Sequence, residues 1–326
     1  MVRKIVLIML GLALGLSACG NLPSAGDAGA LTHIRLPTGY IPNIQYAPFY
    51  VAIEKGYFRD AGIEIEFDYS FETDGVALVG ADELPFAIVS GEQVLLAREQ
   101  GLPVKYAMAW YQQFPVSIVA KAQTGIKTPD DLKGRKIGLP GLYGASYVGL
   151  RAFLFASGIK ESDVTLDSIG FNQVEALISD QEDAIVVYSA NEPIQLRAQG
   201  VDIISFNVAD AVNLASNGII TNEKIISENP ELVRGFIEAA LKGVNAAIAN
   251  PQEAIELSKT YIPNYKELDP AVVEQVLSAS IDMWKAERLG YSDPAAWENM
   301  KNILVGMGLV SKSLDIKAAY TNEFIP

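Results

Sequence analysis

The sequence predicts an α/β fold of two lobes joined by a hinge, with a helical carboxyl-terminal extension. Short apolar runs alternate with helix-like segments as far as about residue 200, a pattern typical of α/β domains. After Ile220 the pattern is almost entirely helical, which indicates the extension. Two extended segments, Val116–Ala120 and Gly218–Thr221, flank a middle block of about a hundred residues. This arrangement is expected if the chain crosses to a second lobe and returns.

Each expected strand is a short apolar run, and each expected helix is a longer amphipathic one. The strands are expected at Ile34–Leu36, Ile63–Phe67, Phe86–Val89, Val104–Ala109, Val116–Ala120, Lys136–Leu139, Ile185–Val187 and Ile203–Phe206. The helices are expected at Tyr46–Lys55, Glu92–Gln100, Ser146–Ser157, Gln173–Ser179 and Pro193–Gln199, with later ones opening at Pro230, Pro251, Pro270 and Pro294. These elements give lobe 1 as 33–116 plus 219–326, and lobe 2 as 117–218.

The first residues have the pattern of an export signal. Arg3 and Lys4 precede an apolar run that is too short for a stable membrane span, and small residues follow it. Cys19 is the only cysteine, and its place after Leu16-Ser17-Ala18 resembles the lipobox of bacterial lipoproteins. The resemblance implies a signal peptide at 1–18 and a lipid on the Cys19 thiol. Residues 19–32 have the small, polar composition of a flexible linker.

Composition excludes several classes of function. The body of about 290 residues is longer than a single core usually becomes, so two lobes are expected. Loss of Arg3 and Lys4 with the signal takes the formal charge from −14 to −16, which opposes nucleic acid and anionic lipid. With His33 as the only histidine, a zinc site or a Ser-His-Asp arrangement is excluded, and no metal or other cofactor is expected.

Several short motifs carry a family resemblance. They are Pro42-Asn43-Ile44-Gln45-Tyr46, the run Tyr50–Phe58 and the run Ala61–Ile65, with further agreement at Val89–Glu92, Gly125–Gly138 and Thr221–Glu223. Together they resemble solute-binding proteins of ABC importers, in the branch related to thiamine-pyrimidine synthases. The resemblance implies a two-lobed periplasmic-binding-protein fold of type II. Members of this branch bind thiamine-pyrimidine precursors, riboflavin, sulfonates, taurine or nitrate.

Position 46 departs from that family pattern. Asn43 aligns with a ligand-contacting asparagine of the pyrimidine branch, but Tyr46 stands where that branch commonly has histidine. This departure weakens the case for a pyrimidine ligand. It also removes the histidine that a synthase would use.

The loops after the expected strands contain aromatic and amide residues but no Arg or Lys. Such loops are expected to face a shared cleft, because ligands of open α/β sheets bind beyond the carboxyl ends of strands. The cation-free loops are Thr38–Tyr46, Ser70–Val76, Ser90–Gln93, Trp110–Pro115, Pro140–Tyr147, Tyr188–Pro193 and Asn213–Gly218. A binder of sulfonate or nitrate needs cationic donors, so these loops favour a neutral aromatic heterocycle such as riboflavin or an unphosphorylated pyrimidine.

The candidate ligand-binding residues follow from these loops. Trp110 and Tyr111, beside Gln112, form a grouping that core packing does not require, and together with Tyr143 and Tyr188 they are expected to stack on a ring. The remaining candidates are Asn43, Gln45, Tyr46, Ser90, Glu92, Gly144, Ser146, Asn191, Glu192 and Asn217. Glu92 and Glu192 could accept hydrogen bonds from a ligand or serve only as helix-start carboxylates. Trp284 and Trp297 are expected in the core.

Three functions are weighed. The first is a monomeric, lipid-anchored solute-binding protein on the extracytoplasmic face of the cell membrane, which closes over a neutral aromatic vitamin and delivers it to an ABC permease. Riboflavin leads as its ligand, and a thiamine-pyrimidine precursor is the alternative. The second is a pyrimidine-synthase-like enzyme, which Tyr46 and the lipobox oppose. The third is a surface adhesion module, whose repeats are not found.

Overall fold

The computed structural model describes residues 30–326. The predicted signal peptide, Cys19 and nearly all of the predicted linker lie outside these residues, so those calls stay predictions. The first strand begins at Thr32, which places the last residue of the predicted linker inside the folded body. Leu31–Pro326 form one compact unit.

Two small sheets are built mainly from the first part of the chain. In one, β1 (Thr32–Pro37) pairs in parallel with β2 (Ile63–Asp68). In the other, β10 (Gly218–Asn222) lies between β3 (Ala87–Val89) and β4 (Val104–Ala109) and is antiparallel to both. The extended segment predicted at Gly218–Thr221 therefore does return the chain to the sheet of β3 and β4.

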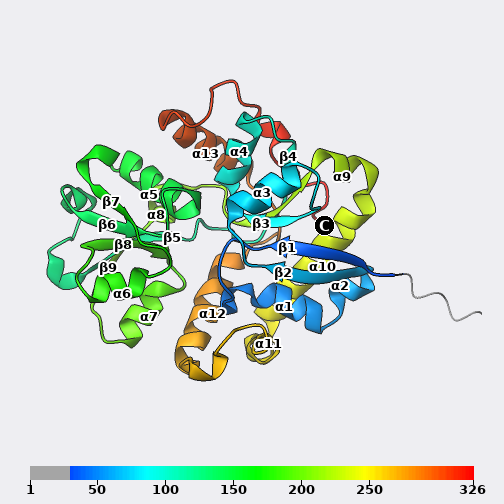
Figure 1. Ribbon diagram of the computed structural model, residues 1–326, viewed down its shortest axis with the longest axis horizontal. Coiled ribbons are helices and arrows are strands. Elements are labelled where there is room, and N and C mark those ends of the chain that lie inside the picture. The colour runs from blue at the N-terminus through cyan, green and yellow to red at the C-terminus, as the bar shows by residue number, and fades with distance from the viewer. Residues whose placement is uncertain (1–29) are drawn as a thin grey trace, which may run out of the picture. The chain divides into compact units, whose positions relative to one another are not determined.

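The middle of the chain forms a five-stranded sheet in the order β7-β6-β8-β5-β9 (Figure 1). Its strands are β5 (Val116–Lys121), β6 (Lys136–Leu139), β7 (Thr165–Ser168), β8 (Ala184–Tyr188) and β9 (Ile203–Asn207). The chain enters through β5, which is antiparallel to β8 and β9, while β6 is parallel to β7 and β8. The predicted lobe boundaries follow this division of the sheets, but they stay a prediction.

Helices cover these sheets. A 3-10 turn, η1 (Ile44–Tyr46), leads into α1 (Ala47–Glu54). The others up to β10 and just after it are α2 (Tyr57–Asp60), α3 (Glu72–Gly80), α4 (Gly91–Glu99), α5 (Gly144–Ala156), α6 (Gln173–Ile178), α7 (Glu192–Ala198), α8 (Val208–Ala211) and α9 (Glu223–Glu228). The predicted strands and helices are confirmed to within about two residues at each end.

The elements expected from the sequence did not include β7, α2, α3, α8 or α9. β7 has the sequence Thr-Leu-Asp-Ser and is only half-buried at the sheet edge, so it has no apolar run. α3 begins inside the predicted loop Ser70–Val76 without a side-chain cap, and it contains Gly75. A larger residue would not fit at position 75, because a Cβ there would lie 2.8 Å from Cβ of Pro37.

The carboxyl-terminal helices are α10 (Pro230–Ala249), α11 (Pro251–Ser258), α12 (Pro270–Trp284) and α13 (Pro294–Gly306). Each opens at the predicted proline, after an Asn or Asp whose side chain caps the first turn. They are not a separate appendage. α10 packs directly on α1, because Gly243 lets the backbones approach and a Cβ there would lie 2.1 Å from the Pro48 carbonyl oxygen. Trp284 and Trp297 are fully buried, as predicted.

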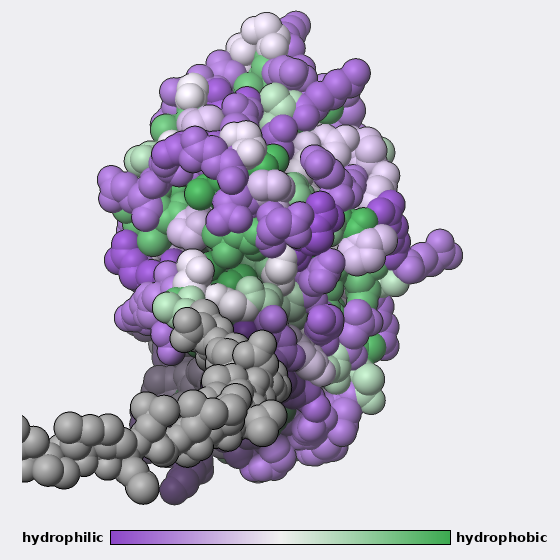
Figure 2. All heavy atoms as spheres, turned by 90° about the vertical axis from the view of Figure 1, so that its right-hand side faces the viewer, coloured by the Kyte–Doolittle hydropathy of each residue, from purple (hydrophilic) through white to green (hydrophobic). Residues whose placement is uncertain are grey.

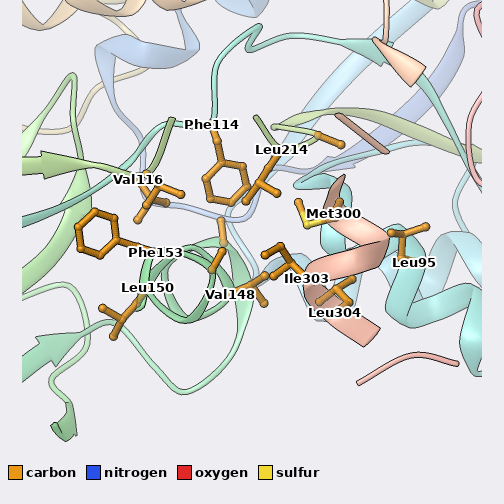
Figure 3. Packing of buried hydrophobic residues seen from close by; sticks show 14 of the residues in the cluster. Leu95, Phe114, Val116, Val148, Leu150, Phe153, Leu214, Met300, Ile303 and Leu304 are labelled. Atoms are coloured by element: carbon orange, nitrogen blue, oxygen red, sulfur yellow. The ribbon is translucent and has the colours of Figure 1, made fainter. Parts of the chain in front are cut away.

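One hydrophobic cluster joins the two segments through which the chain enters and leaves the five-stranded sheet. Phe114 and Leu214 belong to these segments, and in Figure 3 they lie between Val116 on one side and Met300 of α13 on the other. The contact with α5 is close, because a Cβ at Gly149 would lie 2.8 Å from Cε1 of Phe114. This cluster connects α5 to α13 and fixes where the crossing segments pass.

One face of the molecule is mainly hydrophilic. Figure 2 shows one face on which hydrophilic side chains predominate and hydrophobic ones form small separate patches. Among residues 30–326, no helix combines the length and the apolar character needed to cross a membrane.

Candidate functional site

A pocket of about 900 Å³, counting the solvent at its mouth, lies where the predicted loops meet. Its walls come from the loops after β1, β4 and β6, the first turns of α3, α5 and α7, and the segment before β10. Most of the candidate residues line it: Gln45, Tyr46, Trp110, Tyr111, Tyr143, Gly144, Ser146, Tyr188, Asn191, Glu192 and Asn217.

Four candidates do not line the pocket. Asn43 caps η1, where its Oδ1 accepts a hydrogen bond from the backbone N–H of Gln45 at 3.0 Å. Gln112 donates weakly to the backbone carbonyl of Ala109 at 3.4 Å. Ser90 and Glu92 are fully buried beside Glu72, which does line the pocket. Asn43 therefore positions Gln45, and contact of these four residues with a ligand stays a prediction.

The structure also adds lining residues that were not among the candidates. Tyr40, Phe71, Glu72, Thr73 and Phe171 are the most distinctive of them. Glu72 and Thr73 lie in the cation-free loop Ser70–Val76, which was predicted to face the cleft, so the sequence could have indicated both as lining residues. Phe171 was missed because it follows β7, the strand that the apolar pattern did not reveal.

The inner wall is an aromatic cluster that belongs to the core. Trp110 is 4% exposed, and its ring centroid lies 5.0 Å from that of Phe49 and 6.0 Å from that of Trp284. Tyr111 is 2% exposed and meets Trp110 edge to face at 4.8 Å. The interpretation that this grouping is not needed for packing was therefore wrong. Its rings pack the core and face the pocket at once.

Hydrogen bonds fix the polar groups of this wall. The Gln45 amide donates to the Tyr111 hydroxyl at 3.1 Å, and the Tyr46 hydroxyl donates to the Thr38 carbonyl at 2.8 Å. Burial raises the pKa of Tyr111 to about 12 and raises the pKa of Tyr46 well above its ordinary value. Both phenols are therefore neutral hydrogen-bonding groups.

The mouth of the pocket is bordered by four aromatic rings that meet across it. Tyr40 and Phe71 follow β1 and β2, whereas Tyr143 and Phe171 follow β6 and β7. Tyr40 contacts Phe171 edge to face at 4.8 Å, and Phe71 contacts Tyr143 in the same way at 5.8 Å. Phe71 and Tyr143 are each 47% exposed, so the rim rings can move without opening the core.

Glu192 is one of the carboxyl groups that line the pocket. Glu192, at the start of α7, accepts hydrogen bonds from the Tyr188 N–H at 3.0 Å, the Asn191 amide at 3.1 Å and the Tyr40 hydroxyl at 3.4 Å. It lines the pocket and also stands in the first turn of α7, while a hydrogen bond from a ligand to it stays a prediction. Burial raises its pKa.

Glu72 and Glu92 form a second acidic group. The Ser90 hydroxyl contacts both of them, at 2.6 Å from Oε2 of Glu72 and in a very short contact with Oε1 of Glu92. Burial raises the pKa of Glu72 to about 8, with a further rise from the nearby Glu92, and burial raises the pKa of Glu92 to about 7. The Asn217 amide donates to Oε1 of Glu72 at 3.3 Å.

No Arg, Lys or His lines the pocket in the described part of the chain. None of the ion pairs found within residues 30–326 includes Glu72, Glu92 or Glu192. His33 stands on β1, 3.2 Å from Glu66, with 55% of its side chain exposed. Residues 30–326 contain no group of three or more His, Cys, Asp or Glu side chains that could hold a metal ion. The site thus offers aromatic faces, amides and carboxyl groups.

Solved structures share this architecture. The periplasmic aliphatic sulphonate binding protein SsuA from Escherichia coli superposes with a TM-score of 0.70, covering 88% of this chain and 91% of that one at 13% identity. The chain therefore has the periplasmic-binding-protein fold, as predicted.

Sequence comparison identifies the family of the chain and several named relatives. A profile of the family described as NMT1/THI5 like matches residues 43–254, and the chain belongs to this family. It is 43% identical to the riboflavin-binding protein RibY of Chloroflexus aurantiacus over 93% of this chain and 89% of the relative. It is 30% identical to the formylaminopyrimidine-binding protein of Halalkalibacterium halodurans over 91% of each. A 4-amino-5-hydroxymethyl-2-methylpyrimidine phosphate synthase of Legionella pneumophila is 20% identical over 90% of this chain and 93% of the relative.

Proposed function

We propose that this protein is the solute-binding component of an ABC importer and that its ligand is riboflavin. The observation that carries the ligand class is the pocket itself, in which aromatic rings, amides and carboxyl groups occur without a cation. The 43% identity to a riboflavin-binding protein, across nearly the whole of both chains, supports the choice within that class.

The ring system would enter between the buried wall and the rim. Trp110, Tyr46 and Tyr188 present faces or edges for an aromatic ligand. Asn191 and Asn217 can donate to ring carbonyls or accept from ring N–H groups. The protein performs no chemistry in this proposal. It closes over the ligand because the closed state binds the ligand more tightly than the open one.

The cellular setting belongs to the same proposal. A lipid on Cys19 would hold the protein on the extracytoplasmic face of the cell membrane, where it would pass its ligand to a permease as a monomer. The acidic net charge of −14 supports a lipid tether over a basic membrane-binding patch.

A thiamine-pyrimidine precursor is the second candidate ligand. It is favoured by the 30% identity to a formylaminopyrimidine-binding protein and by the carboxyl groups of Glu72 and Glu192, which can accept from an amino group on a ring. A synthase function is disfavoured, because His33 is the only histidine of the sequence and it is exposed on β1 rather than lining the pocket.

Calorimetry with the signal-free protein separates these candidates. Riboflavin, an aminopyrimidine and an alkylsulfonate would be titrated in parallel, and mass spectrometry would identify small molecules that co-purify. Riboflavin is expected to bind most tightly, with quenching of flavin fluorescence as rings stack on it. Tighter binding of the aminopyrimidine would reverse the choice of ligand, and micromolar binding of the alkylsulfonate would contradict the argument from missing cations.

A further inference from the structure

The side chains of Glu72, Ser90 and Glu92 form a continuous row from the pocket into the core. Glu72 opens α3 and lines the pocket, Ser90 precedes α4, and Glu92 lies in the first turn of α4. The Ser90 hydroxyl touches a carboxyl oxygen of each neighbour, at 2.6 Å for Glu72 and closer for Glu92. Ser90 and Glu92 have no exposed surface.

The number of protons in this row can be counted. A hydroxyl carries one proton, and an ionised carboxylate can only accept hydrogen bonds. If both carboxyl groups were ionised, the Ser90 hydroxyl could donate its one proton to only one of them. The Ser90 oxygen would then face an oxygen of the other carboxylate with no proton between the two oxygens. One additional proton satisfies both contacts, because one carboxyl then donates to the Ser90 oxygen while Ser90 donates to the other.

Within residues 30–326, compensation for ionised carboxylates comes only from neutral groups: the starts of α3 and α4, backbone N–H groups and the Asn217 amide. On α4, the Gln93 amide reaches Oε1 of Glu92 only at 3.4 Å, and Arg98 is paired with Glu223 at 2.9 Å instead. Oε2 of Glu92 is buried with no hydrogen-bond partner. An ionised carboxylate in such a place carries a large desolvation cost, which a proton removes.

The groups that face the pair from other elements are also neutral or acidic. The Tyr106 phenol of β4 approaches Glu92, while the phenols of Tyr46 and Tyr188 approach Glu72. Across the pocket, α7 contributes Glu192. These groups would add repulsion or weak polarity, and none of them supplies a positive charge. The raised pKa values, about 8 for Glu72 and about 7 for Glu92, indicate that the pair holds a single proton between about pH 7 and pH 8 and two protons below that range.

We propose that Glu72 and Glu92 share one proton through Ser90, and that this proton makes Glu72 a selector for uncharged ligands. The selection part rests on the proposed function. With Glu72 and Glu192 both ionised, a pocket walled by aromatic rings would favour an organic cation. With the shared proton in place, the pocket carries less negative charge and accepts a neutral ring beside the Glu72 and Asn217 side chains.

Infrared titration of the empty protein tests the shared proton without any ligand. The wild-type protein is expected to show the C=O stretch of a protonated carboxyl at about pH 7.5, between the two pKa values, and to lose it as the pH rises above about 8. At about pH 7.5 the signal should be weaker in Glu92→Gln, because the charge of Glu92 no longer raises the pKa of Glu72, and weaker in Glu72→Gln, because the remaining Glu92 has the lower pKa of about 7. Glu182→Gln is the matched control, since Glu182 is 3% exposed but lies 3.1 Å from the Lys136 ammonium group. Absence of the signal from the wild-type protein at this pH, or a signal of unchanged strength in both variants, would overturn the shared proton.

Ligand titration between pH 6 and pH 9 tests the selection. Riboflavin affinity of the wild-type protein should fall roughly tenfold over this range, a usual size for coupling between two bound species. Glu92→Gln should shift this fall in affinity to lower pH although residue 92 does not line the pocket, and Glu182→Gln should retain the wild-type profile. Equal pH profiles in wild-type and Glu92→Gln protein would overturn the selector role. Absence of riboflavin binding at pH 6 would remove the selector role together with the proposed function, while the infrared result would still decide the shared proton.

Discussion

The indole of Trp110 packs against the phenol of Tyr46, with ring centroids 5.4 Å apart and planes inclined by 32°. Both residues line the pocket, and both are 4% exposed. The same aromatic contact therefore stabilises the core and shapes the ligand site. Mutations on this wall must be read for stability before they are read for binding.

Replacing Trp110 by alanine should unfold the empty protein more easily. Trp110 also packs on Phe49 and Trp284, so the expected loss is about 3–5 kcal/mol of unfolding free energy, as for other large buried rings. Urea denaturation of the signal-free protein measures it. Trp110→Phe is the control and should lose much less. An unchanged denaturation midpoint for Trp110→Ala would mean that the Trp110 ring contributes to ligand binding but not to the stability of the empty protein.

Tyr143 offers the opposite case. Its ring is 47% exposed and touches Phe71 edge to face across the mouth of the pocket. Tyr143→Ala should leave the melting temperature of the empty protein nearly unchanged but weaken ligand binding by about 1 kcal/mol, or roughly fivefold. Exposed Phe155 provides a control that does not line the pocket. If Phe155→Ala weakened binding as much as Tyr143→Ala, the rim would have no special role.

The lipid anchor is tested by a change at Cys19. Cys19→Ser should release the protein from membranes, because only the thiol can carry the lipid implied by the lipobox. Ligand affinity should stay the same, since the pocket is built from residues 38–217. Cell fractionation and calorimetry measure the two effects. Continued membrane retention of the variant would point to a different tether.

Sequence reasoning succeeded where a local pattern decides the structure. The four carboxyl-terminal helices open at proline after an Asn or Asp cap, so their starts could be located exactly. The pocket loops could be predicted because ligands bind beyond strand ends. Trp110 was misjudged because its burial depends on Trp284, which lies far away in the sequence and reaches it only through the packing of α12.

The missed parts have two physical causes. β7 is a half-buried edge strand without an apolar run, so Phe171 behind it was missed as well. The contact of Ser90 with Glu72 joins residues 18 positions apart. No periodicity within α3 or α4 could reveal that contact, since it depends on how the two helix starts meet.

The stability of the empty protein should fall as pH rises. The folded-state pKa of Glu72 is about 8 and that of Glu92 about 7, above the ordinary value of 4.5. A carboxyl whose pKa is higher in the folded state stabilises the fold while it is protonated, and this contribution is lost as pH passes from about 4.5 to 8. The difference in unfolding free energy between wild-type and Glu92→Gln protein, measured in urea at several pH values, isolates it. A difference that does not change with pH would show that Glu92 is ionised throughout.

Ligand binding should depend little on salt. Screening weakens interactions between charges, and no cationic side chain lines the pocket in the described chain to pair with a ligand. Riboflavin affinity should therefore change less than about twofold between low and high ionic strength at pH 6, whereas an anion held by Arg or Lys would lose affinity steeply. The informative control is Gln173→Lys, which places a cation in the pocket lining. This variant should gain affinity for alkylsulfonates, and that gain should vanish as salt is added. A steep salt dependence in the wild-type protein would mean that a cationic side chain reaches the ligand after closure, and the choice of an uncharged ligand would then be wrong.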